Sequence, residues 1–344
     1  MIAYDARPLQ PKTRHWGVGV VIDTILSRLN TQFEFCGLAH KFAGYKQEGI
    51  HAWPTIKKSN AIFFEISPLL LRSYDLYWGT NHFIPAATTK PSILTVHDLL
   101  LLDYPWDQSW SQLWGRRFIS ALRRSKTILA DSETTAHDLV AKFPSISSKT
   151  IVARLGFCQP ILDLQVPNLQ FSNPYLVMLG AHRPRKNMRL ALDVVQSLAR
   201  NGKRIQLVVT GDVHQSFQKE IDGLPEMVRA VGVLSKSELF WLMQNSIGLL
   251  FPSLYEGFGF PILEAMAVGC PVLALDTPIN REIGGAAALL LPNQPEPWVK
   301  AIRRLEADAV FRSEIVCMGR ENVSRFSWDS TAAVYSQAIH HVLG

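Results

Sequence analysis

The chain has 344 residues, of which 47% are hydrophobic and 19% charged, and its formal net charge is +6. This length suits two domains of ordinary size, and the composition excludes an intrinsically disordered chain. The modest positive charge fits an anionic small ligand, a membrane surface or a nucleic acid, and it does not choose among them.

The cysteines and the first residues bear on the cellular compartment. The four cysteines are scattered: Cys36, Cys158, Cys270 and Cys317. Because none has CxxC spacing, a zinc or redox motif is not expected, and single cysteines fit a reducing compartment. Asp5 and Arg7 stand where a secretory signal would be apolar, and no apolar run approaches the ~18 residues that cross a bilayer. We therefore expect a cytoplasmic protein without a metal site.

In the first 160 residues, short apolar runs alternate with longer amphipathic segments. Strands are expected at Ile2–Tyr4, Leu76–Trp78, Ser92–Val96, Thr127–Ala130 and Lys149–Val152. Helices are expected at Val20–Leu29, Trp106–Arg124 and Thr134–Lys142. This alternation predicts parallel strands joined by crossover helices.

A proline-rich break at Gln159–Pro174 is typical of a linker, and the alternation then restarts. Strands are expected at Tyr175–Leu179, Gln206–Thr210, Gly248–Phe251 and Pro271–Leu275. Helices are expected at Met188–Asn201, Ser237–Gln244, Pro261–Val268, Trp298–Glu306 and Ser330–Val342. The sequence thus predicts an α/β protein with two doubly wound parallel-sheet domains, 1–160 and 175–328, followed by a last helix in 329–344. Ligands of such sheets bind at the carboxyl ends of the strands, here facing a cleft.

The segment Phe251–Gly269 reads FPSLYEGFGFPILEAMAVG and combines a strand end, a glycine turn and a helix start. Such a turn lets the backbone approach a phosphate, towards which the N–H groups of the first helical turn point. Glu264 is expected in that first turn, and Glu256 in the loop. Because carboxylates are strong acceptors for vicinal hydroxyls, we expect Glu264 to hold a ribose and Glu256 a transferred sugar. For Glu264 alone, favourable helix-dipole electrostatics is the alternative explanation.

A basic turn follows the strand at Tyr175–Leu179, where residues 180–187 read GAHRPRKN. Arginine can grip a diphosphate with two hydrogen bonds, and lysine can act as a point charge. Fixed cations also stabilise the charge that a departing diphosphate gains, so they would take the place of Mg²⁺. A solvated basic turn without a ligand is the alternative.

These two strings resemble the E-x7-E and Pro-Arg-Lys-Asn motifs of the retaining nucleotide-sugar glycosyltransferases of family 4, which have the GT-B fold. The resemblance covers nearly the whole chain and implies that Glu264 contacts the ribose and that Arg185 and Lys186 bind the diphosphate. It implies that Glu256 contacts the donor sugar. Further donor contacts are implied for Gly257, Phe258, Gly259 and Phe260, and, at the base, for the backbone of Val233 and Leu234.

The same resemblance extends to the N-terminal half. Gly17 and Gly19 would form a glycine loop before the first helix and face the donor phosphates. His97, in Thr-Val-His-Asp-Leu at a strand end, would lie beside the donor sugar as a catalytic residue; a packed core histidine is the alternative. Asn81 and His82, after the strand at Leu76–Trp78, are expected to contact the acceptor; for His82, a loop residue without a ligand is the alternative. The resemblance also implies that the last helix, expected at Ser330–Val342, packs back on the N-terminal domain.

An aromatic stripe lies in the helix expected at Trp106–Arg124. Trp106, Trp110 and Trp114 recur at four-residue steps and are followed by several arginines. Such a stripe suits peripheral contact with the anionic inner face of a membrane, which a lipid-linked acceptor would favour. A core-facing helix with a solvated side is the alternative.

The resemblance implies a hexosyltransferase that needs no cofactor and uses a nucleotide-diphosphate sugar as co-substrate. The acceptor would be a hydroxyl of a glycan or lipid-linked molecule. The two motifs look most like those of bacterial polysaccharide and lipopolysaccharide mannosyltransferases, so mannose from GDP-mannose is the first expectation. An epimerase of the same fold and a non-catalytic nucleotide-sugar binder remain open. A nicotinamide dehydrogenase is disfavoured, because Ile22 replaces the third glycine of GxGxxG. No nucleic acid partner is expected.

Overall fold

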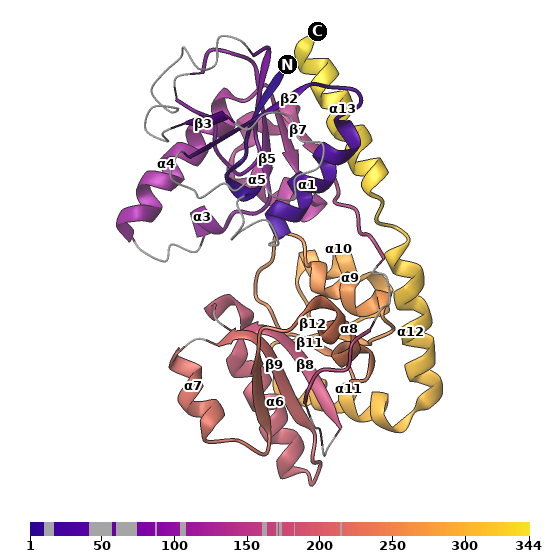
Figure 1. Ribbon diagram of the computed structural model, residues 1–344. Helices are drawn as coiled ribbons and strands as arrows, with labels where there is room; N and C mark the ends of the chain where they lie inside the picture. Colours follow the sequence, from indigo (N-terminus) through magenta and orange to yellow (C-terminus); the bar gives the residue numbers. More distant parts are fainter. Residues whose placement is uncertain are drawn as a thin grey trace. The chain divides into compact units, whose positions relative to one another are not determined.

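The computed structural model describes residues 1–9, 17–40, 57–59, 74–86, 88–103, 108–159, 164–169, 171, 174–181, 183–213 and 215–344. The chain divides into two compact units, one of Met1–Gly156 with Phe326–Gly344 and one of Phe157–Arg325. Each unit contains one parallel sheet with helices packed against it (Figure 1). The predicted α/β class with two doubly wound parallel sheets is confirmed.

The sheet of the first unit has the strand order β3-β2-β1-β4-β5-β6-β7. In that order the strands are Lys57–Ser59, Phe35–His40, Ile2–Asp5, Leu76–Gly79, Ser92–Val96, Thr127–Ala130 and Thr150–Val152. The chain starts in the middle and winds first one way and then the other, so the order reverses between β1 and β4, which pair through Ile2 and Leu76. Ligands of open α/β sheets bind beside the carboxyl ends of the strands at such a switch point.

The helices of the first unit connect these strands. They are α1 Gly17–Leu29, α3 Leu100–Asp103, α4 Gln108–Arg124, α5 Glu133–Lys142 and α13 Trp328–Leu343, with short 3₁₀ turns η1 Arg7–Leu9 and η3 Pro144–Lys149. The expected strand at Lys149–Val152 therefore begins one residue later, where η3 ends. The expected helix at Val20–Leu29 begins earlier, at Gly17.

The sheet of the second unit has the order β10-β9-β8-β11-β12-β13. In that order the strands are Val228–Gly232, Gln206–Val213, Tyr175–Ala181, Leu249–Phe251, Val272–Leu275 and Ala288–Leu291. The helices are α6 Met188–Arg200, α7 Gln215–Asp222, α8 Lys236–Gln244, α9 Phe260–Ala267, α10 Pro278–Gly284, α11 Pro295–Ala307 and α12 Ala309–Val323, with 3₁₀ turns η4 Pro184–Lys186 and η5 Gly285–Ala287. The order reverses between β8 and β11, so the loops that follow these two strands emerge side by side.

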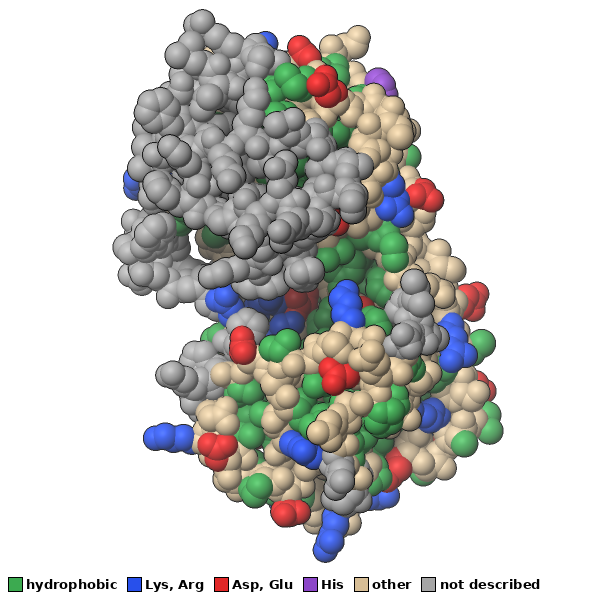
Figure 2. Space-filling view, in the orientation of Figure 1, with side chains coloured by type: hydrophobic (Ala, Val, Ile, Leu, Met, Phe, Trp, Pro, Cys, Tyr) green, Lys and Arg blue, Asp and Glu red, His purple; other side chains and the backbone are tan. Residues whose placement is uncertain are grey.

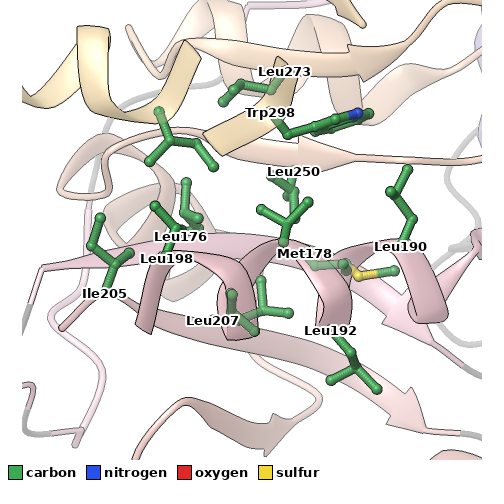
Figure 3. Close-up of a cluster of buried hydrophobic side chains, with 14 of the residues drawn as sticks. Leu176, Met178, Leu190, Leu192, Leu198, Ile205, Leu207, Leu250, Leu273 and Trp298 are labelled. Atoms are coloured by element: carbon green, nitrogen blue, oxygen red, sulfur yellow. The ribbon is translucent and has the colours of Figure 1, made fainter. Parts of the chain in front are cut away.

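The core of the second unit fills the space between its sheet and helices α6 and α11. Figure 3 shows leucines of α6 facing the strand side chains Met178, Leu207 and Leu250. Trp298 of α11 is fully buried, and its indole Nε1 donates to the Pro292 carbonyl at 2.8 Å. Interiors packed in this way are rigid, so the loops at the strand ends start from fixed positions. On the face of this unit shown in Figure 2, basic and acidic side chains are interspersed.

The final helix α13 belongs to the first unit and lies beside α1 (Figure 1). Its Thr331 hydroxyl donates to the Arg154 carbonyl at 2.7 Å, and Arg28 Nε of α1 donates to Asp329 at 2.9 Å. The buried Tyr335 hydroxyl lies 2.9 Å from the hydroxyl of Thr95 on β5. The helix is therefore anchored to the central strands of this sheet.

Gly156 leaves no room for a side chain where α13 begins. A Cβ there would lie 2.1 Å from the backbone nitrogen of Trp328, which cannot move without displacing the helix start. We expect Gly156→Ala to lower the Tm by about 5 °C or more, because overpacking costs roughly 1–3 kcal/mol. Gly115→Ala in α4 is the control, since its Cβ would meet only Leu102 Cδ2 at 3.7 Å. Thermal denaturation should leave that Tm unchanged or raised; equal Tm values for both variants would contradict the clash.

The aromatic stripe of α4 is described only in part. Trp106 and the side chain of Trp110 lie outside the described residues. Trp114 is half-buried, its ring centroid lies 4.9 Å from that of Phe83, and the Arg117 guanidinium lies 5.1 Å from the Trp114 ring. Within the described part of the chain, no helix is long and apolar enough to cross a membrane. Peripheral membrane contact stays a prediction.

Candidate active site

In the second unit, strand β11 leads through a loop into α9, as the sequence predicts. Gly259 precedes the helix with φ +103°, a left-handed conformation that strains any residue with a side chain. The helix begins at Phe260, one residue before the expected start, so Pro261 is its second residue. Glu264 is therefore the fifth residue, and α9 has no acidic residue in its first turn. The prediction that Glu264 lies in the first turn was wrong because Gly259, and not Pro261, sets the boundary.

The two phenylalanines that flank Gly259 pack against each other. Phe258 is buried, and the ring centroids of Phe258 and Phe260 lie 5.0 Å apart. Their side chains therefore hold the turn in shape. Any ligand contact from Phe258, Gly257 or Gly259 would come from the backbone.

The basic turn after β8 is joined to the loop after β11 by hydrogen bonds. Leu254 N donates to the Arg185 carbonyl at 2.8 Å, and Asn187 Nδ2 donates to the Pro252 carbonyl at 3.2 Å. Asn187 has φ +55°, a left-handed conformation that asparagine tolerates better than most residues. These contacts fix the direction in which η4 presents Arg185 and Lys186.

The two cations of this turn meet Glu256, which is 70 residues away in the sequence. Lys186 Nζ lies 2.7 Å from one carboxylate oxygen, and Arg185 Nη1 lies 2.7 Å from the other. Arg185 Nη1 also donates to the Tyr255 carbonyl at 2.9 Å. The three side chains are only 12–18% exposed. They form a largely desolvated cluster with one positive charge in excess, which we call the ion triad.

The surroundings give the two acidic residues of the E-x7-E string opposite pKa shifts. Burial alone would raise the pKa of Glu256, but the charges and hydrogen bonds of Lys186 and Arg185 outweigh it and hold that pKa below its ordinary value. Burial raises the pKa of Glu264, which Lys236 offsets only in part from 3.8 Å. At neutral pH Glu256 is therefore a carboxylate, and its anionic form is the more strongly stabilised of the two.

The loop between β10 and α8 contains Val233 and Leu234. Val233 is 80% exposed, although its side chain is apolar, and Gly232 before it has φ +70°. The loop ends in a capping box, in which Ser235 accepts from Glu238 N and Glu238 accepts from Ser235 N. The exposed valine gives this loop an apolar surface that is not used for packing.

In the first unit, the glycines expected in a loop before α1 lie inside the helix. Gly17 is the first helical residue, and Gly19, the third, is buried. The prediction of a glycine loop at these two positions was wrong, because the helix starts before the run of β-branched residues that suggested its beginning. The preceding residues 10–16 lie outside the described ones.

His97 lies at the end of β5 and is buried, with both ring nitrogens engaged. Its Nε2 lies 2.7 Å from the Thr80 carbonyl oxygen, which can only accept, so Nε2 donates. Its Nδ1 lies 2.6 Å from Asp131 Oδ2. Asp131 is a functional candidate that the sequence analysis missed. It follows β6, which pairs with β5 through Val96 and Ala130, so strand adjacency brings the two residues together.

Two buried histidines in this region have opposite pKa shifts. Burial would lower the pKa of His97, but the charge and hydrogen bond of Asp131 and the bond to the Thr80 carbonyl raise it above its ordinary value. Burial, with the nearby charge of His97, lowers the pKa of His82 to about 3. The two rings lie 5.5 Å apart, and His82 has φ +63°. Asp131 therefore determines which of the two carries a charge.

The structure thus brings some of the predicted residues together, in two places that each lie within one unit. Glu264 lies instead near Lys236. In the second unit Arg185, Lys186 and Glu256 are in direct contact. In the first unit His97 and His82 are neighbours, and the half-buried Asn81 precedes His82 in the chain. Among the described residues, no group of three or more His, Cys, Asp or Glu side chains has an arrangement that would hold a metal ion.

Comparison with known proteins identifies the class. Residues 163–321 match the family described as "Glycosyl transferases group 1". O-antigen chain mannosyltransferase B of Escherichia coli is 25% identical over 284 residues, which are 76% of this chain and 73% of that protein. O-antigen chain mannosyltransferase RfbU of Salmonella typhimurium is 28% identical over 240 residues, 68% of this chain and 66% of that protein.

A solved structure supports the fold. Anabaena Alr3699/HepE, in complex with UDP and glucose, superposes with a TM-score of 0.73 at 17% identity, covering 98% of this chain and 99% of that one. The chain therefore contains a group 1 glycosyltransferase domain and has the GT-B fold. It is an enzyme of the transferase class, and the epimerase and non-catalytic alternatives are disfavoured.

Proposed function

We propose that this enzyme is a retaining family 4 glycosyltransferase that moves a hexose from a nucleoside-diphosphate sugar to a hydroxyl of a glycan or lipid-linked acceptor. Mannose from GDP-mannose is the first candidate, in the synthesis of a surface polysaccharide at the inner face of the membrane. The observation that carries the proposal is the ion triad of Arg185, Lys186 and Glu256 close in sequence to the start of α9. The names of the Escherichia coli and Salmonella relatives support mannose, and the UDP and glucose of the Anabaena structure support a nucleotide-sugar donor.

The proposed donor contacts follow the chemistry of each group. Arg185 and Lys186 bind the diphosphate, since they combine bidentate and point-charge recognition. Backbone N–H groups of the Gly257–Phe260 turn complete the anion site. Glu264 accepts from the ribose hydroxyls, and the backbone of Val233 and Leu234 contacts the edge of the base. No cofactor is proposed.

The reaction itself exchanges one bond for another at the sugar. The bond between the anomeric carbon and the phosphate oxygen breaks, and a bond to the acceptor oxygen forms on the same face. The acceptor's proton passes to the departing phosphate oxygen. Because the diphosphate gains negative charge as it leaves, Arg185 and Lys186 stabilise the transition state more than the bound substrate. Glu256 accepts from the hydroxyls of the transferred sugar.

The residues of the first unit have proposed roles at the sugar and the acceptor. His97 is proposed beside the donor sugar. Because its two nitrogens already bond Thr80 and Asp131, its contribution would be a fixed charge and a ring surface and not proton transfer. Asn81 and His82 are proposed to contact the acceptor.

A thermal-shift screen over GDP-, UDP- and ADP-sugars tests this proposal. A donor present at 100 times its Kd should stabilise the protein by roughly 2.7 kcal/mol, and we expect the largest shift with GDP-mannose. Release of nucleoside diphosphate should then depend on an added acceptor. If no nucleotide sugar raises the Tm and none is consumed, the proposed function is wrong. Consumption of the donor without diphosphate release would instead indicate an epimerase.

A further inference from the structure

The cations proposed to bind a diphosphate are already engaged by a carboxylate of the same protein. Each oxygen of Glu256 takes one cation, at 2.7 Å from Lys186 Nζ and 2.7 Å from Arg185 Nη1. All three side chains are more than four-fifths removed from solvent. A diphosphate that uses these two cations must therefore compete with Glu256 for them.

Displacing Glu256 from the two cations is energetically unfavourable because the cluster is largely desolvated. Charges interact more strongly in a partly desolvated cluster than in bulk water, so a phosphate brought to the cations is also repelled by the adjacent carboxylate. A buried carboxylate separated from its cations keeps its charge and loses its partners, which is strongly unfavourable. The penalty falls on the ligand unless the ligand itself satisfies the freed carboxylate.

An intact nucleotide sugar and a free nucleoside diphosphate differ in their ability to satisfy the freed carboxylate of Glu256. The sugar brings hydroxyl donors, from which a carboxylate accepts hydrogen bonds. Its esterified terminal phosphate also carries less negative charge than the free terminal phosphate of a nucleoside diphosphate. The intact donor can therefore compensate Glu256, whereas the free diphosphate adds repulsion and lacks the hydroxyls of the transferred sugar.

We propose that Glu256 makes the site discriminate between the intact nucleotide sugar and the free nucleoside diphosphate. Its ion pairs with Arg185 and Lys186 oppose the binding of the free diphosphate to these cations. This inference rests on the proposed function and gives Glu256 a role besides contact with the sugar. Binding of the donor exchanges the carboxylate–cation contacts for phosphate–cation and carboxylate–hydroxyl contacts. After transfer the sugar is gone, Glu256 regains the cations, and the product diphosphate is released.

Calorimetric titration with GDP and with GDP-mannose tests this role in the Glu256→Gln variant, in which the carboxylate becomes a neutral amide of the same size. We expect GDP to bind this variant about tenfold or more tightly than the wild type, since close charge pairs couple by about the 1.4 kcal/mol that tenfold represents, or by more. GDP-mannose should bind equally or more weakly, so the preference for the sugar nucleotide falls by at least that factor. In turnover assays, GDP should become a stronger product inhibitor.

Two further variants control the experiment. Glu306→Gln removes the same charge from a surface pair, in which Glu306 lies 2.6 Å from Lys203, and should leave both affinities unchanged. Glu256→Asp keeps the charge but is too short to bridge both cations, so its GDP affinity should lie between the wild type and Glu256→Gln. It also provides the measurement if Glu256→Gln does not fold.

The outcomes separate this inference from the function on which it rests. If the wild type binds GDP-mannose and Glu256→Gln leaves the ratio of the two affinities unchanged, the discrimination is wrong and the donor site stands. If the wild type binds neither ligand, and UDP and UDP-glucose run in parallel also fail, the proposed function is wrong and this inference with it.

Discussion

Lys186→Ala is expected to lower kcat/KM by about 10²–10³, because removing one fixed group that stabilises developing negative charge typically costs that factor. The fold should survive, since Glu256 keeps Arg185 as its partner at 2.7 Å and no carboxylate is left alone. Glu256→Ala should also lower turnover by orders of magnitude. Acceptor-dependent release of nucleoside diphosphate measures the effect, and thermal denaturation checks the fold.

The matched control for this prediction is Lys203→Ala. Lys203 also forms a short ion pair with a glutamate, but the pair lies on the surface and its lysine is 43% exposed. Exposed pairs contribute little, so this variant should keep wild-type turnover and stability. Near-normal rates in both Lys186→Ala and Glu256→Ala would refute the assignment of the ion triad to the reaction.

Asp131→Asn is expected to lower the free energy of unfolding by about 3 kcal/mol at pH 6, because it removes one partner of a buried charged pair. Without the carboxylate, burial dominates at His97 as it does at His82, whose pKa is about 3. The pKa of His97 should then fall below its wild-type value, because the charge and hydrogen bond of Asp131 no longer oppose burial. Urea denaturation at pH 6 and pH 8.5 measures the effect.

The pKa shift of His97 determines how the effect of Asp131→Asn on stability changes with pH. In the wild type the pKa of His97 is raised above 6.5, so its contribution is fully present below pH 6.5 and is lost as the pH rises through the folded-state pKa. In Asp131→Asn we expect a lower folded-state pKa, so this histidine contributes less stability at low pH than it does in the wild type. The difference in the free energy of unfolding between the two proteins should therefore be larger at pH 6 than at pH 8.5.

Other groups near His97 allow a control. Asp98 acts on His97 only through its charge, and its Oδ1 accepts from Leu100 N at 2.9 Å. Asp98→Asn should give a much smaller loss of stability, with the wild-type direction of pH dependence. If the difference in the free energy of unfolding between the wild type and Asp131→Asn stays constant across the pH range, His97 is not charged in the folded protein.

The strand–turn–helix string around Glu256 and the basic turn at Arg185 could be predicted because each is local in sequence. Their contact could not be read from either string alone. It depends on β8 and β11 being neighbours, with Leu249 paired to Val177, across the point where the strand order reverses. A doubly wound topology places those two loops together, and the same reasoning applied to β5 and β6 would have paired His97 with Asp131.

The sequence does not predict strand β2, and it places two helix starts too late, for physical reasons. Strand β2, Phe35–His40, contains Gly37, which weakens a strand pattern. The structure explains the glycine, since a Cβ there would lie 2.8 Å from the Tyr4 hydroxyl. Helices α1 and α9 begin earlier than the apolar and proline signals of the sequence predict, because helix boundaries carry the weakest sequence signal.

The most direct measurement is an experimental structure of the enzyme bound to a nucleoside-diphosphate sugar such as GDP-mannose. We predict diphosphate oxygens at hydrogen-bond distance, about 3 Å, from the side chains of Arg185 and Lys186, with Glu256 turned to the sugar hydroxyls. A diphosphate bound elsewhere, with both cations still on Glu256, would contradict the proposed site.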